Sequence, residues 1–318
     1  MIWIWNSETS ATLRISTVLS IFSPKVMPDQ PGSFLISKKP LHNGVVFSFS
    51  HALHPSHMLD LPLLDITGDH HVHTRFCNHA VGEMEEYVTA AIDKGLRSLT
   101  FLEHLECGLS YNPRIWLTPE VFQQYFQEGE QLREKYADRI TIRLGAEIGY
   151  NPGAVDELLA MLAAFPFAHR GLSCHFYFDG NEHLNMLSRR TDHIKKMNEL
   201  GTEPILDAYF SNLIKGCRDI PCDKLCHLDA ALRHNAPILT AHHYALIKEL
   251  FAVMLEKDIA LEVNTSGYEL RPHPYPAFAL IQQARQQGIP LIIGSDAHRP
   301  EQVGRFFERA KKELGQSD

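Results

Sequence analysis

Residues 63–73 read Leu-Leu-Asp-Ile-Thr-Gly-Asp-His-His-Val-His, a short and largely apolar run that ends in metal-binding side chains. The run has the length of a buried strand. His71 and His73 lie two residues apart, so on a strand both side chains point to the same face and could hold one metal ion. Asp296 and His298 repeat this spacing near the other end of the chain. The stretch therefore predicts a strand with part of a metal site at its C-terminal end.

Six more strand-like runs follow, and segments with helical periodicity lie between them. The seven predicted strands are residues 63–69, 97–102, 140–145, 171–174, 224–226, 259–263 and 290–294. The predicted helices are residues 84–92, 154–164, 187–200, 244–257, 275–287 and 300–314, and one that begins with Thr118 as its N-cap. This alternation predicts an α/β fold with a parallel sheet. Because no linker or repeat divides residues 61–318, we expect one domain there, large enough for a β/α barrel.

The C-terminal ends of barrel strands meet at one mouth, where active sites lie. Each predicted strand carries an ionisable or metal-binding group at this end. These groups are Asp69, His70, His71, His73 and His79, then Glu103 and His104, Glu147, His175, His227 and Asp229, Glu262, and finally Asp296 and His298. One histidine at a strand end is more often structural, but seven such coincidences predict a metal centre. Imidazole and carboxylate together favour Zn, Fe or Mn over Ca or Mg.

Composition restricts the classes of partner. The 318 residues carry a formal net charge of −8, with a sequence pI near 6.2. This acidic balance argues against nucleic-acid binding and favours a small-molecule substrate. Six scattered cysteines lack the density of a disulfide scaffold, which favours a cytoplasmic protein with reduced thiols. The oligomeric state stays open.

The first 60 residues differ from the rest of the chain. Their short apolar runs are broken by Ser, Pro and Lys, and none approaches the ~20 residues of a membrane span. A basic n-region of a signal peptide is also missing. We therefore predict that residues 1–60 are a poorly ordered N-terminal extension. Alternatively, they are an artefact of the choice of start site, since translation could also begin at Met27 or Met58.

The polar strand ends resemble the motifs of the polymerase-and-histidinol-phosphatase (PHP) superfamily. The motifs correspond to Asp69-x-His71-x-His73, Glu103-His104, His227-x-Asp229 and Gly-Ser-Asp296-x-His298, and the likeness spans about residues 65–305. The resemblance implies a distorted seven-stranded TIM-like barrel and a site for three metal ions. It implies that the first ion is held by His71, His73, Glu147 and Asp296, the second by Glu147, His175 and His227, and the third by His79, His104 and His298.

Residues 73–80, 145–148 and 262–267 are similar to the histidinol-phosphate phosphatase branch of this superfamily. The branch implies hydrolysis of L-histidinol phosphate, a step of histidine biosynthesis. It also implies phosphate binding by Arg233 and Arg271, with Ser295 as a further possible donor; a surface salt bridge and a loop cation are the structural alternatives for the two arginines. Clustered metal ions would neutralise the phosphate and activate water.

Several roles remain open at this level. His298 or Asp229 could protonate the leaving alkoxide. Asp69, Glu103 and Asp229 could accept hydrogen bonds from the ligand histidines. Two other functions also fit the sequence: a PHP phosphoesterase that acts on nucleotides or nucleic-acid ends, and a metal-binding module without catalytic activity.

Overall fold

The computed structural model describes residues 64–235 and 237–315, so the predicted extension over residues 1–60 lies outside the described residues. Seven parallel strands form one sheet in the order β1-β2-β3-β4-β7-β8-β9. They are β1 (Gly68–Val72), β2 (Ser98–Leu105), β3 (Thr141–Gly149), β4 (His169–Ser173), β7 (Lys224–Leu225), β8 (Ala260–Asn264) and β9 (Leu291–Gly294). The predicted seven-stranded parallel arrangement and the distorted barrel are confirmed. The first strand, predicted at residues 63–69, begins later and includes His71 and Val72.

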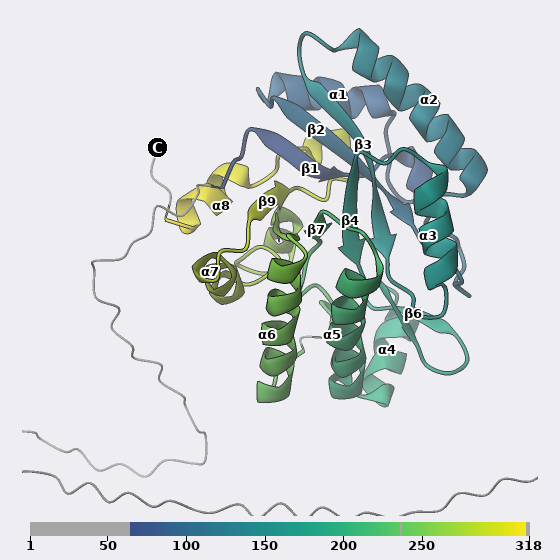
Figure 1. The fold of residues 1–318 in the computed structure, drawn as a ribbon, viewed down its shortest axis with the longest axis vertical. Helices are drawn as coiled ribbons and strands as arrows, with labels where there is room; N and C mark the ends of the chain where they lie inside the picture. Colours follow the sequence, from purple (N-terminus) through teal and green to yellow (C-terminus); the bar gives the residue numbers. More distant parts are fainter. Residues whose placement is uncertain (1–63, 236, 316–318) are drawn as a thin grey trace, which may run out of the picture. The chain divides into compact units, whose positions relative to one another are not determined.

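The sheet curls until its two edge strands nearly meet, as Figure 1 shows for β1 and β9. Val72 and Ala297 form an isolated parallel bridge. The His73 N–H donates to the Ala297 carbonyl at 2.9 Å, and the Ala297 N–H donates to the His71 carbonyl at 3.3 Å. Because Ala297 follows β9, the barrel closes at the C-terminal ends of its strands, between the first and last predicted metal-binding motifs.

Helices cover the outside of the sheet (Figure 1). They are α1 (Met84–Asp93), α2 (Pro119–Lys135), α3 (Val155–Ala164), α4 (Thr191–Leu200), α5 (Thr202–Asp219), α6 (Ala241–Glu256), α7 (Phe278–Gln286) and α8 (Phe307–Glu313). The start of α2 is as predicted, because the Thr118 hydroxyl accepts a hydrogen bond from the Val121 N–H and Pro119 occupies the first turn. Among the described helices, none is long and apolar enough to cross a membrane.

Helix α5 was not predicted from the sequence. Gly201 indicates the end of the preceding helix, and no new helix is predicted after it. In the structure, Gly201 has a φ of 90° and separates α4 from α5. Pro204 lies in the first turn of α5, where its missing N–H removes no helical hydrogen bond. The 18 residues of α5 therefore supply a helix that crosses from β4 to β7.

Three predicted helices are shorter than the periodicity indicates. The helix predicted at 187–200 begins at Thr191, as α4. The helix predicted at 275–287 begins at Phe278, because Tyr275 instead pairs with Asn264 in an antiparallel bridge. The helix predicted at 300–314 divides into a 3-10 turn, Pro300–Gln302, and α8. Gly304 and Phe306 lie between these two segments and have positive φ values of 64° and 59°. A continuous α-helix does not allow such values.

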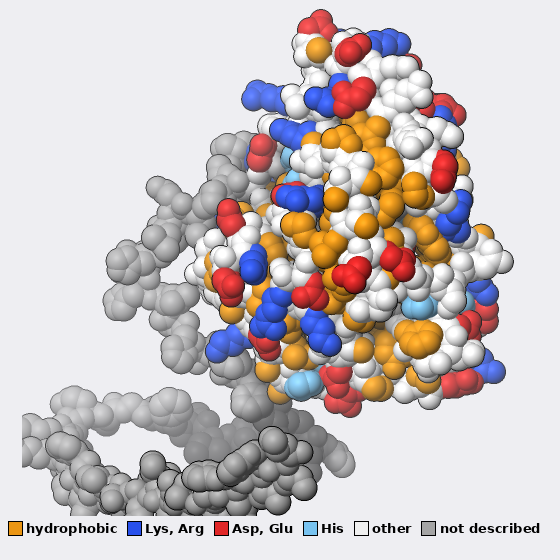
Figure 2. Space-filling view, turned by 45° about the vertical axis from the view of Figure 1, so that its right-hand side comes forward, with side chains coloured by type: hydrophobic (Ala, Val, Ile, Leu, Met, Phe, Trp, Pro, Cys, Tyr) orange, Lys and Arg blue, Asp and Glu red, His pale blue; other side chains and the backbone are white. Residues whose placement is uncertain are grey.

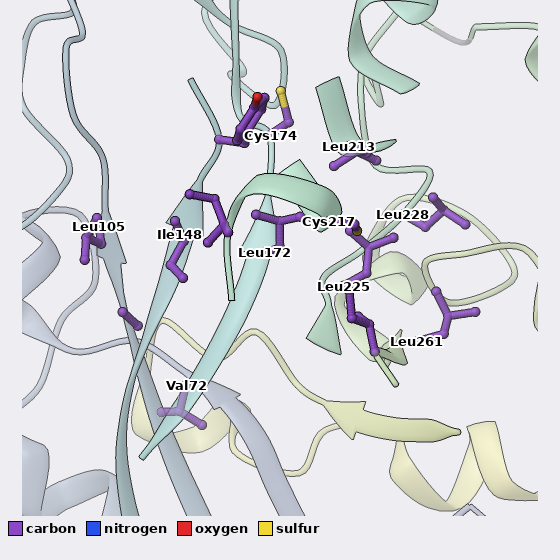
Figure 3. Packing of buried hydrophobic residues seen from close by; sticks show 14 of the residues in the cluster. Val72, Leu105, Ile148, Leu172, Cys174, Leu213, Cys217, Leu225, Leu228 and Leu261 are labelled. Carbon is purple, nitrogen blue, oxygen red and sulfur yellow. The ribbon is translucent and has the colours of Figure 1, made fainter. Parts of the chain in front are cut away.

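The main hydrophobic core lies between the sheet and its helices. Figure 3 shows Leu172 of β4 beside Leu213 and Cys217 of α5, and all three are buried. Leu225 of β7 and Leu261 of β8 continue the same cluster. The barrel interior near the mouth is different, because buried histidines, glutamates and a lysine occupy it. A barrel interior is ordinarily filled by branched aliphatic side chains, so this polar interior marks the functional site.

Candidate metal centre

Four predicted ligands of the first ion converge at the mouth. His71 and His73, at the end of β1, have their Nε2 atoms 3.0 Å apart. The Glu147 Oε2 atom lies 3.5 Å from each of these nitrogens. The Asp296 Oδ1 atom lies 3.8 Å from His71 Nε2 and 3.4 Å from His73 Nε2. Ligand atoms of a tetrahedral zinc ion lie about 3.4 Å apart, so these spacings fit one ion.

The other carboxylate oxygen of Glu147 faces the histidines that were predicted to hold the second ion. This oxygen, Oε1, lies 3.1 Å from His175 Nε2 and 2.6 Å from His227 Nε2. His175 directly follows Cys174 at the end of β4, and His227 follows β7. Glu147 itself is in β3 and is 1% exposed. One carboxylate therefore places an oxygen in each of two ligand groups, which is the arrangement that the resemblance implies.

The third group contains His79 and His298, whose Nε2 atoms lie 2.9 Å apart. The His79 Nδ1 lies 3.0 Å from the Cys77 carbonyl, and the His298 Nδ1 lies 3.0 Å from the Asp296 carbonyl. Both carbonyls accept, so Nδ1 carries the proton in each ring and the two Nε2 lone pairs face each other. Burial lowers the pKa of both rings, to about 3 for His79. Two opposed lone pairs require a cation, so these residues fit a metal ion.

His104 lies between the first and third groups. Its ring stacks on His73 with centroids 4.2 Å apart, and the His79 ring is 5.2 Å away. Its Nδ1 atom is 3.1 Å from Glu147 Oε2. Ligand atoms of His73, His104 and His298 also lie close enough together to share an ion. The structure thus brings all nine predicted ligands to one mouth, and His104, like Glu147, contacts two of the groups.

Two glutamates support the ligand rings from behind. The Nδ1 of His71 lies 2.7 Å from Glu262 Oε1, and the Nδ1 of His175 lies 2.7 Å from Glu106 Oε1. A carboxylate accepts only, so each Nδ1 donates and each Nε2 is directed at the metal position. Sequence analysis assigned neither glutamate this role. Glu106 follows the Glu103-His104 motif by two residues, and Glu262 was noted only as a polar strand end. These positions place both glutamates near the mouth, but they do not indicate which histidine ring each one contacts.

The three carboxylates predicted for this supporting role have other partners. Asp69 accepts from the backbone N–H groups of His71, Ser295 and Gly304. It therefore links β1, the first strand, to the segment that follows β9, the last strand. Glu103 accepts from Thr74 and comes no closer than 4.0 Å to a ligand ring, at His73 Nδ1. Burial raises the pKa of Glu103 to about 8. The third carboxylate, Asp229, pairs with Arg271.

A pocket of about 440 Å³ opens over the ligands. Its wall includes four arginines, namely Arg189, Arg233, Arg299 and Arg305. Arg305 is fixed by donating to the Ser295 and Asp296 carbonyls, at 2.9 Å and 3.1 Å. Sequence analysis named only Arg233 of these four. A cationic wall opposite a group of metal ligands suits an anionic substrate such as a phosphate ester.

The structure does not bring the other predicted phosphate ligands to this pocket. Arg271 lies over the Tyr275 ring and forms an ion pair with Asp229, which also accepts from the Ala277 N–H. Both members of the pair line an adjoining cavity of about 350 Å³, which shares Arg233 with the pocket. Ser295 is fully buried and is not among the residues that line the pocket. Arg233 is therefore the predicted phosphate ligand whose position agrees best with the site.

Comparison with known proteins agrees with this geometry. The PHP domain matches residues 69–266. The chain belongs to the PHP-domain family. A relative of this PHP protein from Deinococcus radiodurans, named a probable histidinol-phosphatase, is 30% identical over 77% of this chain and 92% of the relative. The Bacillus subtilis histidinol-phosphatase is 25% identical, over 76% of this chain and 96% of the relative.

Solved structures share the PHP fold. A Listeria monocytogenes protein assigned as a histidinol phosphatase matches with a TM-score of 0.67 and 19% identity, over 76% of this chain and 99% of that one. The Lactococcus lactis histidinol phosphate phosphatase, solved with zinc, L-histidinol and phosphate, matches with a TM-score of 0.61 and 20% identity, over 79% of this chain and 94% of that one. The predicted family and fold are confirmed.

Metal binding to this PHP protein is expected to depend on pH. Burial disfavours the charged form of His175, but Glu147 and Glu106 outweigh it and raise the pKa of this ring to about 10. The Nε2 proton must therefore leave when an ion binds below that pH, so affinity should increase with pH. We expect zinc affinity to rise about tenfold per pH unit for each proton released between about pH 6 and pH 8. Calorimetry in buffers of different ionisation enthalpy counts these protons; an affinity that is constant over this range would contradict the expectation.

Proposed function

We propose that this protein is a metal-dependent phosphomonoesterase that hydrolyses L-histidinol phosphate to L-histidinol and phosphate. The observation that carries the proposal is the convergence of nine candidate metal ligands at the barrel mouth, seven of which line one pocket together with four arginines. The substrate follows from the relatives, because those compared above are named histidinol-phosphatases or probable ones. A role in histidine biosynthesis and a cytoplasmic location are part of the same proposal.

The proposed cofactors are three ions of Zn, Fe or Mn. The residues that would hold them are His71, His73, Glu147 and Asp296; Glu147, His175 and His227; and His79, His104 and His298. When bound, such ions supply Lewis-acid stabilisation of phosphoryl charge and lower the pKa of bound water. The donor set fits them, because imidazole and carboxylate ligands suit these metals.

The arginines would bind and orient the ester. The Nε of Arg233 donates to the Leu187 carbonyl at 3.2 Å, which fixes the side chain at the edge of the pocket. The terminal guanidinium nitrogens are the groups that we expect to donate to phosphoryl oxygens, which would stabilise charge that develops during hydrolysis. Arg189 and Arg299 are exposed at the same pocket and would attract the anion. Arg271 could join them only by leaving Asp229.

The two groups predicted to protonate the leaving alkoxide, His298 and Asp229, both have other partners. The His298 side chain is 27% exposed and lines the pocket. However, its Nδ1–H donates to the Asp296 carbonyl at 3.0 Å, and its Nε2 would hold a metal ion. The Asp229 carboxylate accepts from Arg271 and from the Ala277 N–H. We therefore assign the proton donor to neither residue.

The surface favours a small substrate over a nucleic acid. Figure 2 shows Lys and Arg interspersed with Asp and Glu on the face drawn, without a continuous basic stripe. The net charge of −8 points the same way. Nucleotides and nucleic-acid ends remain the rival substrates within the family, and a metal-binding module without activity is the rival function.

The test of the proposal is phosphate release from L-histidinol phosphate, measured beside other phosphate monoesters, nucleotides and a dinucleotide. We expect the highest kcat/KM for L-histidinol phosphate, with activity lost after chelation and restored by metal. A higher kcat/KM for a nucleotide would show that the proposed substrate is wrong, but it would leave the proposed metal site unchanged. Metal-loaded protein that releases phosphate from no ester would favour the binding module.

A further inference from the structure

Glu262 of β8 contacts both of the first two ligand groups from behind. Its side chain is fully buried. The Oε1 atom lies 2.7 Å from His71 Nδ1 and accepts from Lys224 Nζ at 2.5 Å. The Oε2 atom accepts from the His227 N–H at 3.1 Å and from Asn264 Nδ2 at 3.0 Å. This carboxylate is therefore saturated with donors, and two of them belong to residues of the metal centre.

Lys224 supplies the countercharge. It lies in β7, the shortest strand of the sheet, and its side chain is fully buried. Besides Glu262, its ammonium donates to the His70 carbonyl at 2.8 Å. Burial of an ammonium group is costly unless it is paired and hydrogen-bonded. An ordinary barrel interior would have an aliphatic residue here, so packing alone does not explain a buried ammonium group at this position.

The backbone conformation of His227 explains why a charged pair is present here. His227 has a φ of 25°, an unfavourable conformation for a residue with a side chain. Its ring lies 2.6 Å from Glu147 Oε1, in the second ligand group. The hydrogen bond from the His227 N–H to Glu262 holds this strained backbone in place. Glu262 thus fixes the ring of a first-group ligand and the backbone of a second-group ligand.

The neighbouring strand leaves room for this arrangement only because Gly294 has no side chain. A Cβ atom on Gly294 would lie 2.6 Å from Glu262 Oε1 and 2.6 Å from the Cβ of His71. Contacts this short do not occur, so the glycine of β9 is required for the carboxylate and the ligand to sit side by side.

We propose that the buried Lys224–Glu262 pair positions His71 and His227 together, so that the first and second metal sites are coupled through one carboxylate. The inference rests on the metal centre of the proposed function and deepens it. Glu106 is a natural comparison, because its carboxylate contacts a ligand of the second group alone, at His175.

The test is zinc binding by the full-length chain, stripped of metal and titrated against a competing chelator. Glu262→Gln keeps the shape of the side chain, but an NH2 group replaces one of the two accepting oxygens, so one pair of donors loses its acceptor. We expect it to weaken zinc at two of the three sites, by about 10- to 100-fold at each. Lys224→Met should weaken the same two sites. Glu106→Gln is the matched control and should weaken one site.

The double variant Lys224→Met/Glu262→Gln separates positioning from simple stability. Lys224→Met leaves a buried carboxylate without its countercharge and should lower the melting temperature of the metal-free protein. The double variant removes both charges, so we expect it to regain melting temperature but not zinc affinity. The inference is wrong if Glu262→Gln weakens at most one site, or if the double variant regains affinity together with stability. Wild-type protein that binds three zinc ions but hydrolyses no ester would overturn the proposed function and leave this inference intact.

Discussion

Replacement of Glu147 by alanine is expected to remove two of the three metal ions and to lower phosphate release by at least about a thousandfold. The reason is geometric, since Oε2 faces His71 and His73 while Oε1 faces His175 and His227. Loss of the metal ions removes several kcal/mol of charge stabilisation, and each 1.36 kcal/mol is about a factor of ten in rate. Metal analysis and single-substrate kinetics on the same preparation measure both effects.

The control for this variant is Glu157→Ala, which removes an exposed glutamate of α3. It should keep both metal content and activity. A Glu147→Ala protein with full metal content and full activity would show that the carboxylate does not bridge the two ligand groups.

Replacement of Arg233 by methionine is expected to lower kcat/KM by about 10²- to 10³-fold, the usual cost of one donor to developing charge. Metal content should stay unchanged, because Arg233 lies in the pocket wall and contacts none of the nine ligands through a described hydrogen bond or ion pair. Methionine keeps much of the apolar stem, so the loss reports mainly on the guanidinium.

Arg271→Met is the matched comparison for this variant. In the structure its guanidinium is paired with Asp229 outside the pocket, so we expect a clearly smaller loss of kcat/KM. A loss at Arg271 as large as that at Arg233 would mean that Arg271 leaves Asp229 during turnover and binds the phosphate, which is the role that the family resemblance implies.

The ligand set was accessible from the sequence because it depends on local order. In a parallel barrel, the residue that follows a strand must lie at the mouth, so His175, His227 and Asp296 could be placed without tertiary information. Strand periodicity alone set His71 and His73 on one face. The division among three ions was implied only by the family resemblance. In the structure, Glu147 lies between the first and second groups, and His104 lies between the first and third.

The supporting residues could not be found in the same way. The contact of Glu262 with His71 joins residues 191 positions apart, and nothing near either residue indicates the pairing. Ser295 and Asp229 belong to the predicted motifs, yet Ser295 is fully buried and Asp229 pairs with Arg271. Helix α5 was missed because Gly201 indicates a helix end, whereas a second helix begins directly after it with Pro204 in its first turn.

We propose that nine residues at the barrel mouth hold three metal ions and that hydrolysis requires these ions. Elemental analysis of the purified chain, before and after chelation, tests this when the same samples are assayed for phosphate release. We expect about three equivalents of Zn, Fe or Mn per active chain, and loss of activity in parallel with loss of metal. Full activity in protein that retains no metal would show that the ions are not required.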